Sequence, residues 1–80
     1  MSLFSEWIGW AGVAAILGAY ALVSLGFLQG NDVTYQCLNV VGAICVAYDA
    51  LKQKNWQPVV LNVIWALIAL IALGKIFLMK

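Results

Sequence analysis

The sequence predicts an all-α integral membrane protein built as a bundle of three helices. Hydrophobic residues make up 66% of the 80 residues, charged residues make up 9%, and the mean hydropathy is +1.03. So little polar material cannot cover a water-soluble surface. The apolar residues also fall into three long runs, each close to the roughly 20 residues that a helix needs to cross a hydrocarbon core.

The three runs predict membrane spans at about 7–28, 34–51 and 58–77 of a single domain, residues 1–80. Helices are expected rather than barrel strands, because lipid leaves backbone groups without water partners and three runs cannot close a β-barrel. Tyr35–Tyr48 is apolar apart from amides and cysteines, so the middle span reaches membrane length only by including its polar ends.

Turn and cap residues predict where the helices end. Gly30 is expected to stop the first helix in a left-handed conformation, and Asn31 or Asp32 to cap the second. Asn55 can cap the third helix, and Pro58 falls in its first turn, where a missing N–H does no harm. Both connections are therefore predicted to be tight.

The lysines predict an orientation in the membrane. The second loop contributes Lys52 and Lys54, and the α-amine lies on the same side, whereas Lys75 and Lys80 lie on the other. The positive-inside rule then places the N-terminus and the second loop in the cytoplasm, by a margin of one charge. Insertion in both orientations stays open as an alternative.

The residues of common catalytic sites are missing from the sequence. It has no His, no Cys-x-x-Cys, no Gly-rich phosphate loop and no acidic pair at catalytic spacing. A net charge of +1 without a basic cluster gives nucleic acid nothing to bind. We therefore expect neither an enzyme nor a cofactor nor a nucleic-acid partner; the expected partners are membrane lipid, further copies of the chain or a larger membrane complex.

Small and polar residues recur at helical spacing in all three runs. Membrane helices associate through close approach at small residues and through hydrogen bonds between helices, so these stripes are expected to face one another. The stripes comprise Gly12, Ala15, Ala19 and Gly26 in the first run; Gln36, Asn39, Gly42, Ala43, Ala47 and Ala50 in the second; and Asn62, Trp65, Ala66, Ala69 and Ala72 in the third.

The polar members of the bundle allow two interpretations. They can join helices through hydrogen bonds, or they can line a path for a small polar solute. Antiparallel packing would place Asn39 level with Tyr20 and Ser24, and Asn62 on the other side of the membrane midplane. The indole N–H of Trp65 needs a partner inside the third span. The candidate substrate-binding residues are Asn62, Trp65, Asn39, Tyr20 and Ser24.

In the same antiparallel arrangement, Asp49 and Tyr48 lie at the same depth in the membrane as Asn62, and they form a candidate gate. One interpretation makes Asp49 an interfacial acid paired with Lys52, three residues on. The alternative makes it a gate that responds to protons or cations.

Three motifs resemble a family of small, uncharacterised bacterial three-helix membrane proteins, and this resemblance implies a location in the bacterial inner membrane. The motifs are "LGAYALVSLGFL", "YQCLNVVGA" and "PVVLNVIWALIAL", and the resemblance covers about residues 7–70. "QPVVLNVIWA" is also similar to the opening of the third helix in half-size SWEET sugar transporters, which work as homodimers. That likeness implies that Asn62 faces the substrate. The first helix lacks the Pro-Gln hinge of those transporters, and Cys45 stands near the position of their stacking tryptophan, which Trp65 could replace.

Two functions are therefore expected as alternatives. The first is a homo-oligomeric, transporter-like bundle that passes or binds a small polar solute, because three helices alone cannot surround one. The second is an accessory subunit that packs against a larger membrane complex.

Overall fold

The structure, a computed structural model, describes residues 3–78. These residues form three α-helices and no strand: α1 (Leu3–Ser24), α2 (Val33–Lys52) and α3 (Trp56–Leu78). The predicted all-α three-helix fold is confirmed. Lys80, which entered the predicted orientation, lies outside the described residues.

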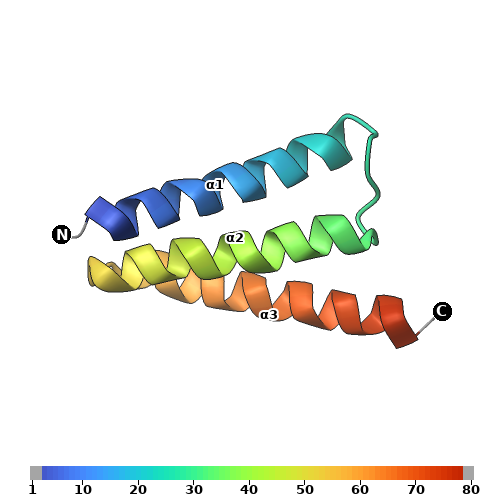
Figure 1. The fold of residues 1–80 in the computed structure, drawn as a ribbon. Helices are drawn as coiled ribbons and strands as arrows, with labels where there is room; N and C mark the ends of the chain where they lie inside the picture. The colour runs from blue at the N-terminus through green and yellow to red at the C-terminus, as the bar shows by residue number, and fades with distance from the viewer. Residues whose placement is uncertain (1–2, 79–80) are drawn as a thin grey trace.

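The helices form a layer with α2 in the middle. Figure 1 shows α2 between α1 and α3, with the α2–α3 turn at the same end of the molecule as the N-terminus. Helix α2 packs against both neighbours, whereas the Cα atoms of α1 and α3 stay more than 8 Å apart throughout residues 3–78. The molecule measures 43 × 24 × 17 Å, so it is long and thin. Only α2 is covered by protein on two sides.

Helix α1 ends earlier than the sequence predicted. Gly26, with φ 89°, has the left-handed conformation expected of Gly30. Its N–H donates to the Val23 carbonyl at 3.1 Å, and the N–H of Phe27 donates to the Leu22 carbonyl at 2.8 Å. These two bonds form a Schellman motif, which satisfies the last carbonyls of a helix. The first connection is consequently the eight-residue segment 25–32, which is not the tight loop that was predicted.

The ends of α2 follow ordinary capping chemistry. Asp32 is the N-cap, and its side chain accepts a hydrogen bond from the Thr34 N–H at 2.8 Å. After α2 the chain turns through Lys54, whose φ of 55° is left-handed, and the Asn55 N–H donates to the Ala50 carbonyl at 2.9 Å. This second connection is as short as predicted, and Pro58 lies in the first turn of α3.

The interior consists of small side chains. Ser5 is the largest side chain among the described residues that is fully buried. The predicted stripes supply most of the interior, because their small residues let backbones approach closely. The buried residues are Ser5, Gly9, Gly12 and Ala19 of α1; Asn39, Gly42, Ala43 and Ala50 of α2; and Asn62, Ala66 and Ala69 of α3.

Helices α1 and α2 approach closely at two glycines. A Cβ atom added to Gly12 would lie 2.5 Å from the Gly42 carbonyl oxygen, and one added to Gly42 would lie 2.9 Å from the Gly12 carbonyl oxygen. Neither position can take a larger residue unless the helices move apart. The absence of a side chain at both positions therefore determines the spacing of α1 and α2.

Two of the three helices have the length and composition of membrane spans. Within residues 3–78, α1 and α3 are long and apolar enough to cross a bilayer. Helix α2 does not reach that level of apolarity, because it contains Gln36, Asn39, Asp49 and Lys52. The difference matches the positions of the helices, since α2 is the one that has protein on both sides.

Candidate functional site

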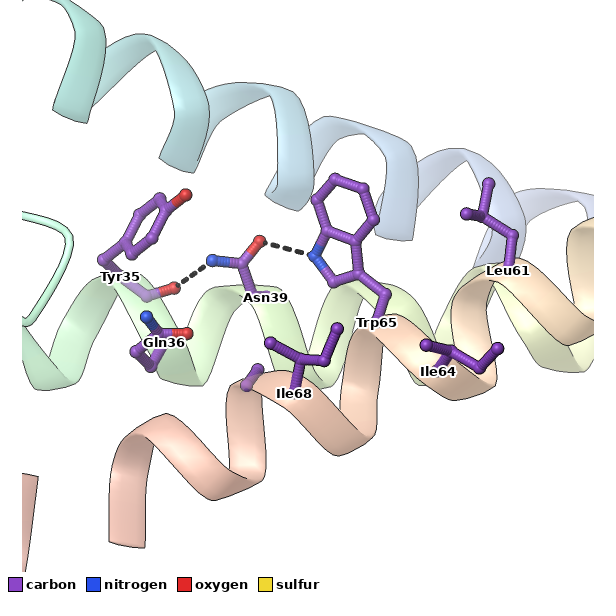
Figure 2. Close-up of a pocket in the computed structure, with 8 residues that line it drawn as sticks. Tyr35, Gln36, Asn39, Leu61, Ile64, Trp65 and Ile68 are labelled. Carbon is purple, nitrogen blue, oxygen red and sulfur yellow. Dashed lines mark hydrogen bonds between the residues drawn. The ribbon is translucent and has the colours of Figure 1, made fainter. Parts of the chain in front are cut away.

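A hydrogen bond between two candidate residues crosses the seam between α2 and α3. The indole Nε1–H of Trp65 donates to the side-chain Oδ1 of Asn39 at 3.0 Å (Figure 2). The Asn39 amide nitrogen donates in turn to the Tyr35 carbonyl at 3.0 Å, one helical turn earlier. Asn39 is 4% exposed and Trp65 is 41% exposed, so the amide is buried beneath the rim that the indole forms. Asn39 is the partner that the Trp65 N–H was predicted to need.

This pair lies in an open groove along the seam, which we call the Trp65 groove. The groove has a volume of about 340 Å³, and Figure 2 shows the indole extending from α3 across α2 toward the Asn39 amide. Its walls are mostly apolar, and its polar groups gather where α2 begins. The groove is lined by Tyr35, Gln36, Asn39, Leu61, Ile64, Trp65, Ile68 and Ala69.

Two polar lining residues of the Trp65 groove were not among the predicted site residues. Tyr35 and Gln36 lie in the first turn of α2, and the Gln36 amide nitrogen donates to the Gly30 carbonyl at 2.7 Å. Gln36 thus ties the groove to the first connection. Their spacing could have predicted this position. Asn39 follows Gln36 by three residues and Tyr35 by four, so the three residues share one face of a helix.

Asn62 lies on the other side of the same seam. Its amide nitrogen donates to the Pro58 carbonyl at 2.8 Å, and it lines a second groove, of about 400 Å³, together with Tyr48. On a helical wheel, the α3 residues of the two grooves fall on either side of the buried Asn62, Ala66 and Ala69 stripe. The structure therefore separates Asn62 from the Asn39–Trp65 pair and groups it with Tyr48.

Tyr20 and Ser24 lie on α1, away from these grooves. Both are exposed, and neither lines the Trp65 groove or the Asn62 groove. Asn39 was predicted to lie at the same depth in the membrane as Tyr20 and Ser24. A shared depth does not bring these residues into one site with Trp65, because α2 separates α1 from α3. The candidate site is consequently built by α2 and α3.

Asp49 faces α1 at the far end of α2. Its Oδ1 atom is buried and accepts no hydrogen bond from any group in residues 3–78. A Cβ atom on Gly9 would lie 2.5 Å from Oδ2, so this glycine makes room for the carboxylate. A pocket of about 270 Å³ contains both Asp49 and Glu6. Glu6 was not predicted to lie here, and only the packing of α1 on α2 brings the two acids together.

Lys52 does not pair with Asp49 as the first interpretation expected. Its ammonium lies 5.5 Å from the centre of the Tyr48 ring, a cation–π arrangement. The reason is geometric, since Asp49 turns toward α1 whereas Tyr48 lines the groove beside α3. The two candidate gating residues therefore belong to different seams.

Residues 5–80 match the model of an uncharacterised protein family. The chain belongs to that family. The match supports the predicted membership of a small uncharacterised family. Neither a curated protein nor a solved structure matches the chain, so the likeness to half-size SWEET transporters has no support.

Proposed function

We propose that the protein is an integral membrane protein whose three helices all cross the bilayer. The supporting observation is the distribution of side chains: the interior holds alanine, glycine, serine and asparagine, whereas the large apolar side chains of α1 and α3 point outward. An exposed apolar surface of this extent fits lipid and not water. The 43 Å length also matches a bilayer of about 40–45 Å including its headgroups.

Helix α2 can cross despite its amides because both of its amide side chains have protein partners. Asn39 bonds to Trp65 and Tyr35, and Gln36 bonds to the Gly30 carbonyl. A polar side chain within a membrane is tolerated when it faces the bundle interior and finds a hydrogen bond there. The middle position of α2 therefore offsets its lower apolarity.

Within this framework, the protein binds a small ligand that carries a polar group in the Trp65 groove. One observation supports this function: a volume of about 340 Å³ combines an indole face and three polar side chains of α2 with apolar walls. Ligand sites have this character, mostly apolar with a few polar groups that fix orientation. The groove is open along its length, so the ligand enters from the membrane or is enclosed by a second copy of the chain.

Native mass spectrometry of protein purified in mild detergent tests this function. We expect a bound molecule on the wild-type chain and its loss from Ile68→Trp, because Ile68 is exposed in the groove and a larger ring there fills the space. Ile71→Trp is the matched control, since Ile71 is exposed on the same helix and lines none of the grooves described above. A wild-type chain that carries only detergent would contradict the proposal.

An accessory subunit is the second candidate, and the outer face of α1 favours it. Small residues form an exposed stripe on the side of α1 opposite α2, and a Cβ atom on Gly18 would have no atom within 4 Å. Such stripes are typical of contacts between membrane helices. Co-purification of a second membrane protein in stoichiometric amount would favour this role. The stripe is formed by Ala11, Ala14, Gly18 and Ala21.

A further inference from the structure

A second hollow follows the Trp65 groove along α3, beside the only cation at that end of the described chain. Beyond Ala69, a chamber of about 440 Å³ is lined by Gly30, Asn31, Ala72, Lys75 and Ile76; we call it the Lys75 chamber. On a helical wheel, Ala72, Lys75 and Ile76 fall on the same face of α3 as the residues of the groove. The two volumes share this face of α3, and the hydrogen bond from Gln36 to Gly30 links a lining residue of the groove to a lining residue of the chamber.

The combined path is apolar over most of its length and polar at one end. From Leu61 to Ile76 it extends about 22 Å, at roughly 1.5 Å of helical rise per residue. This length exceeds half of a hydrocarbon core about 30 Å thick, so a path that starts at the Lys75 end extends past the middle of the bilayer. An acyl chain fits the apolar part, and a headgroup fits the end at Lys75.

The charges around the Lys75 chamber favour a negative headgroup. Lys75 is exposed and forms no ion pair within residues 3–78, and the side chain of Asn31 adds an amide donor. Asp32 is the nearby acid in sequence; it does not line the chamber, and its carboxylate accepts the Thr34 N–H. Lysine side chains at helix ends extend toward the membrane surface, where a positive charge attracts an anionic headgroup.

We propose that the ligand of the Trp65 groove is an anionic phospholipid. Its phosphate binds Lys75 and Asn31, and one acyl chain lies along α3 beneath the Trp65 indole. This inference rests on the proposed function, because it names the ligand class of the same groove. It requires no covalent step, and the half-exposed indole is positioned to report the bound chain directly.

Fluorescence quenching in bilayers tests whether an anionic phospholipid binds in the Trp65 groove. The exposed Trp7, Trp10 and Trp56 are replaced by Phe so that Trp65 is the only tryptophan. The protein is reconstituted with phosphatidylglycerol or phosphatidylcholine that is brominated on one acyl chain. We expect brominated phosphatidylglycerol to quench Trp65 with a relative association constant about fivefold higher, the ratio that one lysine near an anionic surface provides.

Two lysine variants show whether the preference belongs to this site. Lys75→Gln should remove the preference for phosphatidylglycerol, whereas Lys54→Gln, which loses the same charge at the opposite end of the molecule, should keep it. Equal quenching by both lipids, no quenching by either, or a preference that survives Lys75→Gln would each overturn the inference. A non-lipid molecule found by mass spectrometry in the groove would leave the proposed function intact and remove only the phospholipid.

Discussion

At the scale of single residues, the candidate site depends on one side-chain hydrogen bond. The Asn39–Trp65 bond serves both interpretations of the polar residues, because it joins α2 to α3 and also holds the indole at the rim of the groove. Asn62 does not join helices in this way, since its amide nitrogen donates to the Pro58 carbonyl of its own helix. The two asparagines have the same sequence context and different structural roles.

A double-mutant cycle measures the Asn39–Trp65 contribution. We expect Asn39→Leu and Trp65→Phe to show a coupling energy of about 0.6–1.7 kcal/mol in reversible unfolding in mixed micelles, as hydrogen bonds between membrane helices do. Tyr20→Phe combined with Trp65→Phe is the control and should be additive within about 0.5 kcal/mol, because Tyr20 lies on α1. Additive effects in the Asn39–Trp65 pair would contradict the bond.

At the scale of helices, the spacing of α1 and α2 depends on glycines, which have no side chain. Helix α1 contains two kinds of glycine: Gly12 lies against the backbone of α2, and Gly18 faces open space. Both fit a helical sequence pattern equally well. Only the packing of α1 on α2 distinguishes the glycine that must remain from the one that is replaceable.

This difference predicts opposite effects for the same substitution. Gly12→Ala should lower the free energy of unfolding by about 1–3 kcal/mol, because its Cβ would lie 2.5 Å from the Gly42 carbonyl oxygen. Gly18→Ala should raise it by about 0.5–1 kcal/mol, because alanine favours the helix and meets no atom within 4 Å. The same micelle unfolding assay compares them, and equal effects would show that α1 packs through another face.

At the scale of the whole molecule, the layer arrangement implies that α2 crosses the bilayer whenever α1 and α3 do. Helix α2 lies alongside both α1 and α3 over most of its length (Figure 1). If the outer helices cross the bilayer in this arrangement, the middle helix must cross with them. A three-span chain has its termini on opposite sides, whereas crossing by α1 and α3 alone would leave both termini on one side.

Reporter fusions at the two termini test this directly. We expect a cytoplasmic reporter to be active at the N-terminus and an exported reporter to be active at the C-terminus, in keeping with Lys52 at the end of α2 and Lys54 in the second connection. Two termini on the same side would contradict the three-span arrangement. Mixed activity at both termini would instead show insertion in both orientations, without affecting the number of spans.

The sequence alone determined the presence of three helices and most of the residues that face inward. Long apolar runs and small residues at helical spacing indicate these features locally, so Gly12, Asn39, Ala66 and their neighbours were predicted to be buried before any packing was known. The end of α1 was missed because Gly26 and Gly30 both fit a left-handed stop, and only the hydrogen bonds of segment 22–27 decide between them.

The tertiary structure decided which polar residues meet. Antiparallel helices of similar length allow several neighbours, and nothing in their patterns places α2 in the middle. That placement brings Trp65 to Asn39, leaves Tyr20 outside the site and turns Asp49 toward Gly9. The physical reason is that periodicity determines the face of a helix that is buried, whereas the identity of the covering helix depends on contacts between residues far apart in the chain.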